Sequence, residues 1–171
     1  RVVLSGANTY TGTSTISAGT LLVGHLTALG TGAVTVNGGT LALGTFSKTG
    51  GAITFAGGTI TQTSGTFSPT SLTATNTSGT LNLDVTLSGA GSLTMNGAGG
   101  TLSVNGTNTG FAGTTTVTAG TLKGSTADAF GTSAITVNGG TFDLNALTLA
   151  NNVTLNTGGT LSGGTFAVSQ L

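Results

Sequence analysis

The fold of this chain is decided by ten residues, Val34-Thr35-Val36-Asn37-Gly38-Gly39-Thr40-Leu41-Ala42-Leu43. Apolar and polar residues alternate on both sides of an Asn-Gly-Gly turn, which is the pattern of two half-buried strands. The pattern returns late in the chain as Ile135-Thr136-Val137-Asn138-Gly139-Gly140-Thr141-Phe142-Asp143-Leu144. Helices are disfavoured, because glycine is dense and each interior glycine costs a helix about 1 kcal/mol. We therefore predict an all-β chain.

A Gly-Thr pair recurs about every 20 residues, a period that is typical of solenoids in which each repeat adds one coil. The pairs begin at Gly19, Gly39, Gly58, Gly79, Gly100, Gly120, Gly140 and Gly159. The sequence therefore predicts a parallel β-helix of about eight coils of about 20 residues each.

Alternation along each strand predicts which side chains point inward, because neighbouring side chains in a strand face opposite sides. The predicted core residues are Leu41, Leu43, Leu81, Leu83, Leu102, Val104, Phe142, Leu144, Val34, Val36, Ile53, Phe55, Ile135, Val137, Val153 and Leu155. The residues between them form a predicted outward column that contains Thr35, Thr54, Thr136 and Thr154.

A longer repeat runs through the chain, which we interpret as one β-helix segment over residues 1–171. Asn8 to Leu43 aligns without a gap onto Thr109 to Leu144, and with small slips residues 1–72 resemble residues 102–171. Residues 73–101 are the intervening coils. Because the second copy stops early, we expect the segment to belong to something longer.

Composition excludes several functional classes. Only 4% of the 171 residues are charged, against roughly 25% in an ordinary soluble domain. The basic residues Arg1, Lys48 and Lys123 are too few and too scattered to neutralise a nucleic-acid backbone. The chain has no cysteine, and it has no apolar run of about 18 residues that would insert into a membrane.

The sequence contains few residues that could carry catalysis. His25 is the single histidine, and its counterpart in the second copy is Thr126, so we expect it to be a loop residue. The carboxylates Asp84, Asp128 and Asp143 are too few for the acid clusters of enzymes that cleave polysaccharides. We predict no catalytic, cofactor-binding or metal-binding residue and no cofactor. Lys123 and Asp143 each follow a Gly-Thr glycine by three residues, which predicts neighbouring positions in successive coils.

Three stretches near the amino end carry a family resemblance: Leu4-Ser5-Gly6-Ala7-Asn8-Thr9-Tyr10-Thr11-Gly12, Thr15-Ile16-Ser17-Ala18-Gly19-Thr20-Leu21 and Ala28-Leu29-Gly30-Thr31-Gly32. The second copy, Asn108 to Ser133, keeps the frame with Phe111 and Phe130 substituted. These stretches resemble the passenger-associated transport repeat of bacterial autotransporters. The resemblance implies a right-handed parallel β-helix in a surface-exposed or secreted bacterial protein. It implies no catalytic residue, because the family's motif is structural.

A structural role is our first hypothesis: an extracellular β-helical rod that acts as a stalk or fibre of a bacterial surface. Both ends are strand-like and apolar, without the polar cap of a finished solenoid. We expect the chain either to continue in a longer protein or to stack head to tail on its own copies through Val2, Val3, Leu4, Phe166 and Val168.

Two other functions compete with the rod. An adhesin segment would bind glycan or ice through outward threonine columns, although Thr13-Ser14-Thr15, Thr59-Ile60-Thr61 and Thr73-Ala74-Thr75 fall at different positions of their coils. This argues against a flat threonine array. A polysaccharide-degrading enzyme ranks last, because the chain has six charged side chains in all.

Overall fold

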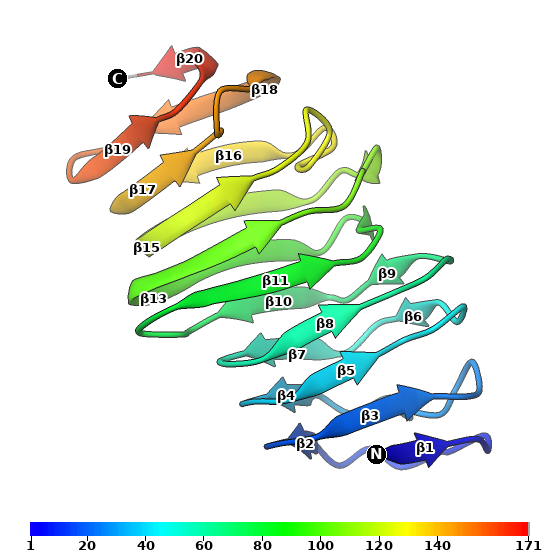
Figure 1. The fold of residues 1–171 in the computed structure, drawn as a ribbon. Coiled ribbons are helices and arrows are strands. Elements are labelled where there is room, and N and C mark those ends of the chain that lie inside the picture. Colours follow the sequence, from blue (N-terminus) through cyan, green and yellow to red (C-terminus); the bar gives the residue numbers. More distant parts are fainter. Residues whose placement is uncertain (171) are drawn as a thin grey trace.

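The computed structural model describes the backbone of residues 1–170 and the side chains of residues 1–167. It is a parallel β-helix that climbs through about eight coils (Figure 1). In Figure 1 the nearer strands run to the right and the farther strands run to the left as the chain rises, so the coils are right-handed. Strands make up all of the regular structure in the described residues. The predicted fold class is confirmed.

Two long faces carry most of the strands, and two strands pass from one face to the other. The first face contains β2 (Ser14–Ile16), β4 (Val34–Val36), β7 (Ala52–Phe55), β10 (Ser71–Ala74), β16 (Ala134–Val137), β18 (Thr148–Leu155), β20 (Thr165–Gln170) and the opening parts of β13 (Ser92–Val104) and β15 (Thr114–Gly124). The second face contains β1 (Val2–Leu4), β3 (Thr20–Val23), β5 (Thr40–Ala42), β8 (Thr59–Thr61), β11 (Thr80–Asp84), β17 (Gly140–Asp143), β19 (Gly159–Ser162) and the closing parts of β13 and β15.

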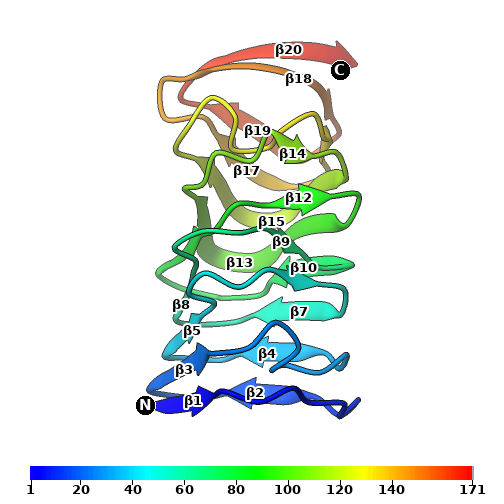
Figure 2. The ribbon, with the colours of Figure 1, turned by 90° about the vertical axis from the view of Figure 1, so that its right-hand side faces the viewer.

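A shorter third face lies between them in the middle coils (Figure 2). Its strands are β6 (Lys48–Thr49), β9 (Phe67–Ser68), β12 (Ser88–Gly89) and β14 (Gly110–Phe111). Strand β6 pairs with β9, β12 pairs with β14, and a bridge between Phe67 and Leu87 links the two pairs. In these middle coils the chain therefore passes from the first face through a turn to the second face, and then through a loop to the third face.

The core is a continuous apolar column inside these faces. Fifteen of the sixteen predicted core residues are buried, and Leu155 is partly buried and packs against the core. The largest fully buried side chains are Phe55, Phe67, Phe130 and Phe142, and the rings of Phe130 and Phe142 meet edge to face with centroids 5.1 Å apart. Aromatic packing of this kind adds to the area effect. The alternation of residues thus predicts the inside of the rod correctly.

The Asn-Gly-Gly turns join the first face to the second. Gly39 has a φ of +71°, a conformation that disfavours side chains, and a Cβ there would overlap the carbonyl oxygen of Gly19 in the coil below. Gly140 repeats this, with a φ of +71° and Gly120 beneath it. Glycine therefore sets both the turn and the close stacking of coils.

The second face contains one change of register that the Gly-Thr period hides. Thr40 pairs with Thr59, but Thr59 then pairs with Asn82 rather than with Thr80. The shift is two residues, so inward side chains stay inward, and Leu83 stacks on Ile60. Above this point the threonines realign, and Thr80, Thr101, Thr121, Thr141 and Thr160 form one column.

Candidate binding surfaces

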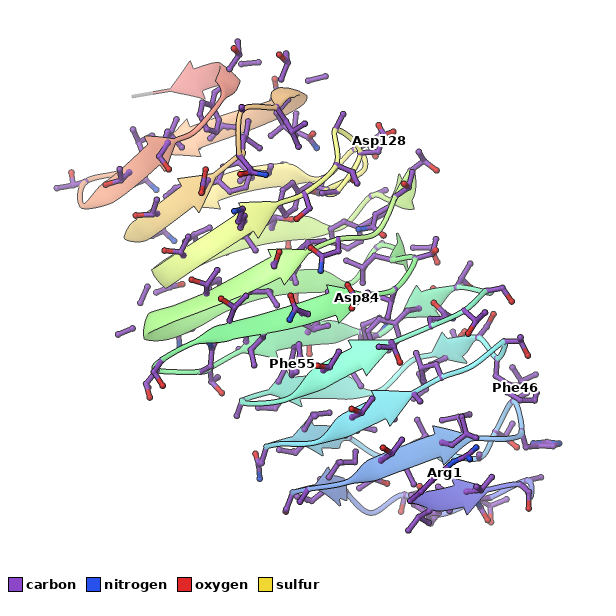
Figure 3. The ribbon with its side chains drawn as sticks, in the orientation of Figure 1. Arg1, Phe46, Phe55, Asp84 and Asp128 are labelled. Atoms are coloured by element: carbon purple, nitrogen blue, oxygen red, sulfur yellow. The ribbon has the colours of Figure 1, made fainter. Side chains whose placement is uncertain are left out.

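The few acid–base residues lie apart. Figure 3 shows Asp84 and Asp128 in different coils, and both side chains are exposed. Asp84 accepts a hydrogen bond from the amide of Asn105 at 2.6 Å. The Nδ1 atom of His25 accepts one from the backbone N–H of Thr27 at 3.2 Å, as a loop side chain does. Within the described residues no group of three or more His, Cys, Asp or Glu side chains is placed to hold a metal ion.

The predicted neighbours Lys123 and Asp143 do stand opposite each other in β15 and β17, so the coil alignment is correct there. Their charged groups form no ion pair. The carboxylate of Asp143 instead accepts the backbone N–H of Asn145 at 2.9 Å, and Asn145 has a positive φ of 50°. Asp143 therefore stabilises its own turn.

A threonine column runs up the outside of the first face. Its members are paired strand to strand without interruption: Thr15, Thr35, Thr54, Thr73, Thr94, Thr116, Thr136 and Thr154. Thr15 is exposed and the other seven are half-buried. No charged residue occurs in the described strands of this face. The predicted outward column of Thr35, Thr54, Thr136 and Thr154 is confirmed. The Thr-x-Thr triplets do fall at different positions, because Thr15 ends its triplet and Thr73 begins its own, yet these two threonines share the column.

A groove follows the corner on either side of β6, and we call it the corner groove. Its lower hollow, of about 480 Å³, lies between the loops of the first two coils and β6, with Asn8, Leu26 and Lys48 in its lining. Its upper hollow, of about 360 Å³, is lined by Ser68, Ser88 and their following loops. Thr49 lines both hollows.

Lys48 is the buried cation of this corner, with only 5% of its surface exposed. It stands in register with Phe67 of the next coil, so it occupies a core position. Its ammonium donates hydrogen bonds to the carbonyl oxygens of Thr49 at 3.2 Å and Gly50 at 2.7 Å. Burial lowers the pKa of Lys48 from 10.5, because the charged form loses water.

In the second repeat, the position that corresponds to Lys48 is apolar. Leu149 is its counterpart of Lys48, since each comes two residues after a tight turn, in which Phe46 bonds to Leu43 and Leu147 to Leu144. Leu149 is 3% exposed and apolar. In the second repeat, Asn151 instead supplies the hydrogen-bond donor at this corner. Its amide donates to the carbonyl oxygens of Phe130, Gly131 and Ser133. A lysine at this corner is therefore particular to the first repeat.

Two asparagines, Asn8 and Asn108, each hydrogen-bond to the loop of the next coil, and we call this contact the clamp. Asn8 donates to the carbonyl oxygen of Ala28 at 2.8 Å, and Asn108 donates to that of Ala129 at 2.6 Å. Asn108 is fully buried and also accepts the backbone N–H of Leu87 at 2.6 Å. By this bonding the counterpart of Asn8 is Asn108, one residue earlier than the gapless alignment places it. Sequence reasoning missed the clamp because the extra residue Gly110 shifts the frame.

The two clamp asparagines fall in segments that match a known family. The profile described as Passenger-associated-transport-repeat matches residues 1–23 and 93–123, and each matched segment contains one clamp asparagine. The chain carries passenger-associated transport repeats. The first matched segment runs from β1 through the loop of Asn8 and β2 to β3 on the second face. The second begins in the opening part of β13, passes through the loop of Asn108 and ends in the closing part of β15, also on the second face.

A curated relative of this repeat protein is the Adhesin BmaC autotransporter of Brucella suis biovar 1 (strain 1330). The two are 58% identical over 41 residues, which is 23% of this chain and 1% of the relative. The repeat protein therefore matches a very small part of that relative's length. No solved structure matches it. No helix in the described residues is long and apolar enough to cross a membrane.

Proposed function

We propose that this chain is a length of rigid shaft in the exported passenger of an autotransporter, with a structural rather than a catalytic role. The observation that carries the proposal is the unbroken parallel ladder and the single apolar core that runs through its coils. A solenoid of this kind has a length set by its number of coils, because each coil pairs strand to strand with the next and shares its core. The transport repeats support an extracellular location at the bacterial surface.

The shaft extends by stacking one more strand on its first coil. Val2 stands in the inward column of Leu21 and Leu41, yet it is 58% exposed, and the neighbouring Val3 is 49% exposed. Such an edge pairs readily with a further strand. The strand comes from the same polypeptide or from the carboxyl end of another copy, where Phe166 is half-buried. The expectation for Val168 lies outside the described side chains.

Electron microscopy of the chain at rising concentration tests the shaft. We expect straight rods with a length of roughly 40 Å, from about eight strand spacings of about 4.8 Å. Compact round particles would overturn the proposal. Filaments that disappear in Val2→Asp but persist in Leu26→Asp would support end stacking, because Leu26 is 60% exposed on a side loop. Single rods at every concentration would oppose end stacking.

A second candidate function is adhesion to glycan, which the threonine column and the adhesin-named relative favour. The test replaces Thr73, Thr94 and Thr116 together by valine, which keeps the shape of the side chains and removes three hydroxyl groups. The matched control replaces Thr101, Thr121 and Thr141, which form a similar column on the second face. Glycan-array binding that the first variant loses and the control keeps supports adhesion through the first face. Equal binding by both variants contradicts it.

A further inference from the structure

We propose that the corner groove binds an acidic sugar, with the carboxylate of a uronic acid directed to Lys48. This inference goes beyond the shaft and does not depend on it. The groove unites a cavity of ligand size, a cation without an acidic partner, hydroxyl-bearing walls and an exposed apolar side chain. The cation, the polar walls and the apolar side chain all line the lower hollow.

The size of the lower hollow suits a small sugar. Its volume of about 480 Å³ falls in the range of about 300 to 1,000 Å³ typical of small-molecule sites. The upper hollow, of about 360 Å³, lies on the other side of Thr49. A single buried monosaccharide leaves the upper hollow free.

The charge of the groove selects an anion. Lys48 has three N–H donors, and the structure uses two of them, on the carbonyl oxygens of Thr49 and Gly50. None of the three aspartates lines either hollow. Because a buried ammonium without an anion is costly, a carboxylate beside it gains a charge-assisted hydrogen bond. The second repeat, with Leu149 in this place, lacks the cation altogether.

The walls select a sugar rather than a simple carboxylate. Thr9, Thr27, Thr31, Ser47 and Asn8 line the lower hollow. The hydroxyls of Thr27 and Ser47 already have hydrogen-bond partners, His25 and the backbone N–H of Thr66, whereas those of Thr9 and Thr31 form no bond to any residue that the structure describes. Leu26 is 60% exposed at the same place, and it offers an apolar surface to the C–H face of a sugar ring. Small-molecule sites usually combine an apolar lining with a few polar groups.

Titration calorimetry and saturation-transfer NMR on the 171-residue chain test the proposal, with glucuronic acid, glucose and acetate as probes. We expect glucuronic acid to bind more tightly than glucose or acetate. Lys48→Met keeps an unbranched apolar stem, and we expect it to weaken glucuronic acid binding about tenfold or more, since it removes a charged donor. Lys123→Met, which removes the same charge from the second face, should bind glucuronic acid like the parent chain.

Several results would overturn the proposal. They are no binding of glucuronic acid by the parent chain, equal binding by Lys48→Met, or acetate binding as tight as that of glucuronic acid. Circular dichroism of each variant establishes that it is folded. Leu26→Ser provides an independent check, because this exposed side chain makes little contribution to the core. We expect weaker glucuronic acid binding in Leu26→Ser, and unchanged binding would contradict the role of the wall.

Discussion

Replacement of Asn108 by alanine should destabilise the rod far more than the same change at Asn8. Asn108 is fully buried, and its amide satisfies two backbone groups, the N–H of Leu87 and the carbonyl oxygen of Ala129. Each group left buried without a partner costs about 1 to 3 kcal/mol, so Asn108→Ala should cost about 2 to 6 kcal/mol. Asn8 is half-buried and makes one such bond, which predicts a loss of about 0.5 to 1.5 kcal/mol.

Urea unfolding followed by the β-sheet signal in circular dichroism measures both free-energy changes. Hydrogen exchange adds a local readout, because the Leu87 amide loses its acceptor in Asn108→Ala and should exchange much faster. Asn108→Asp separates the two bonds: it keeps an acceptor for Leu87 but has no N–H for Ala129 when it is ionised. Its Leu87 amide should therefore exchange more slowly than in Asn108→Ala.

The reasoning would be refuted by equal losses in Asn108→Ala and Asn8→Ala. A Leu87 amide that stays protected in Asn108→Ala would also refute it, since another acceptor would then serve that N–H. The comparison is a fair one, because both asparagines sit in a transport repeat and reach the loop of the next coil. A loss above about 5 kcal/mol would remove the whole stability of a marginal domain.

Three other predictions concern glycine, Lys48 and the threonine column. Gly113→Ala should unfold or separate the coils, because its Cβ would overlap the carbonyl oxygen of Gly91, whereas Gly12→Ala meets nothing within 4 Å; thermal melts compare the two. Since burial lowers the pKa of Lys48 below 10.5, the unfolded chain binds more protons in the alkaline range, so stability should rise with pH up to about 10.5. Urea unfolding at several alkaline pH values should show that Lys48→Met loses this rise and that Lys123→Met keeps it. Thr94→Val should change the melting temperature by little, because Thr94 faces outward and valine suits strands; a large drop would reveal an unseen hydroxyl bond.

Alternation and period predicted most of the architecture because a β-helix repeats one physical problem in every coil. Inward positions demand apolar residues, so Val34 and Phe142 are recognisable without any knowledge of their partners. For the same reason, part of the threonine column could be predicted from the sequence. Thr35, Thr94 and Thr136 each stand between two apolar residues, but Thr94 lies in a long strand without a clear turn, so only the pairing of strands shows that it belongs to the same column.

The polar residues of the interior escaped prediction because their identity follows from hydrogen bonding between coils. A charged residue such as Lys48 is expected on the surface, and nothing in its neighbours along the chain signals a core position. The register change between Thr59 and Asn82 also cannot be recognised from the sequence, because a shift of two residues preserves the alternation of apolar and polar residues. Both features depend on which carbonyl or strand lies one coil away.

The buried polar side chains share a location, the corners at which the chain leaves the strand ladder. Lys48, Asn108 and Asn151 all bond to carbonyl oxygens of loops that leave the strand ladder. A loop that leaves the ladder exposes backbone groups that need a new partner, and it also opens a hollow at the corner. The first repeat meets the need with a cation and the second with an amide. Because the flat faces hold the shape of every coil, the corners are where one transport repeat can differ from the next without loss of the rod.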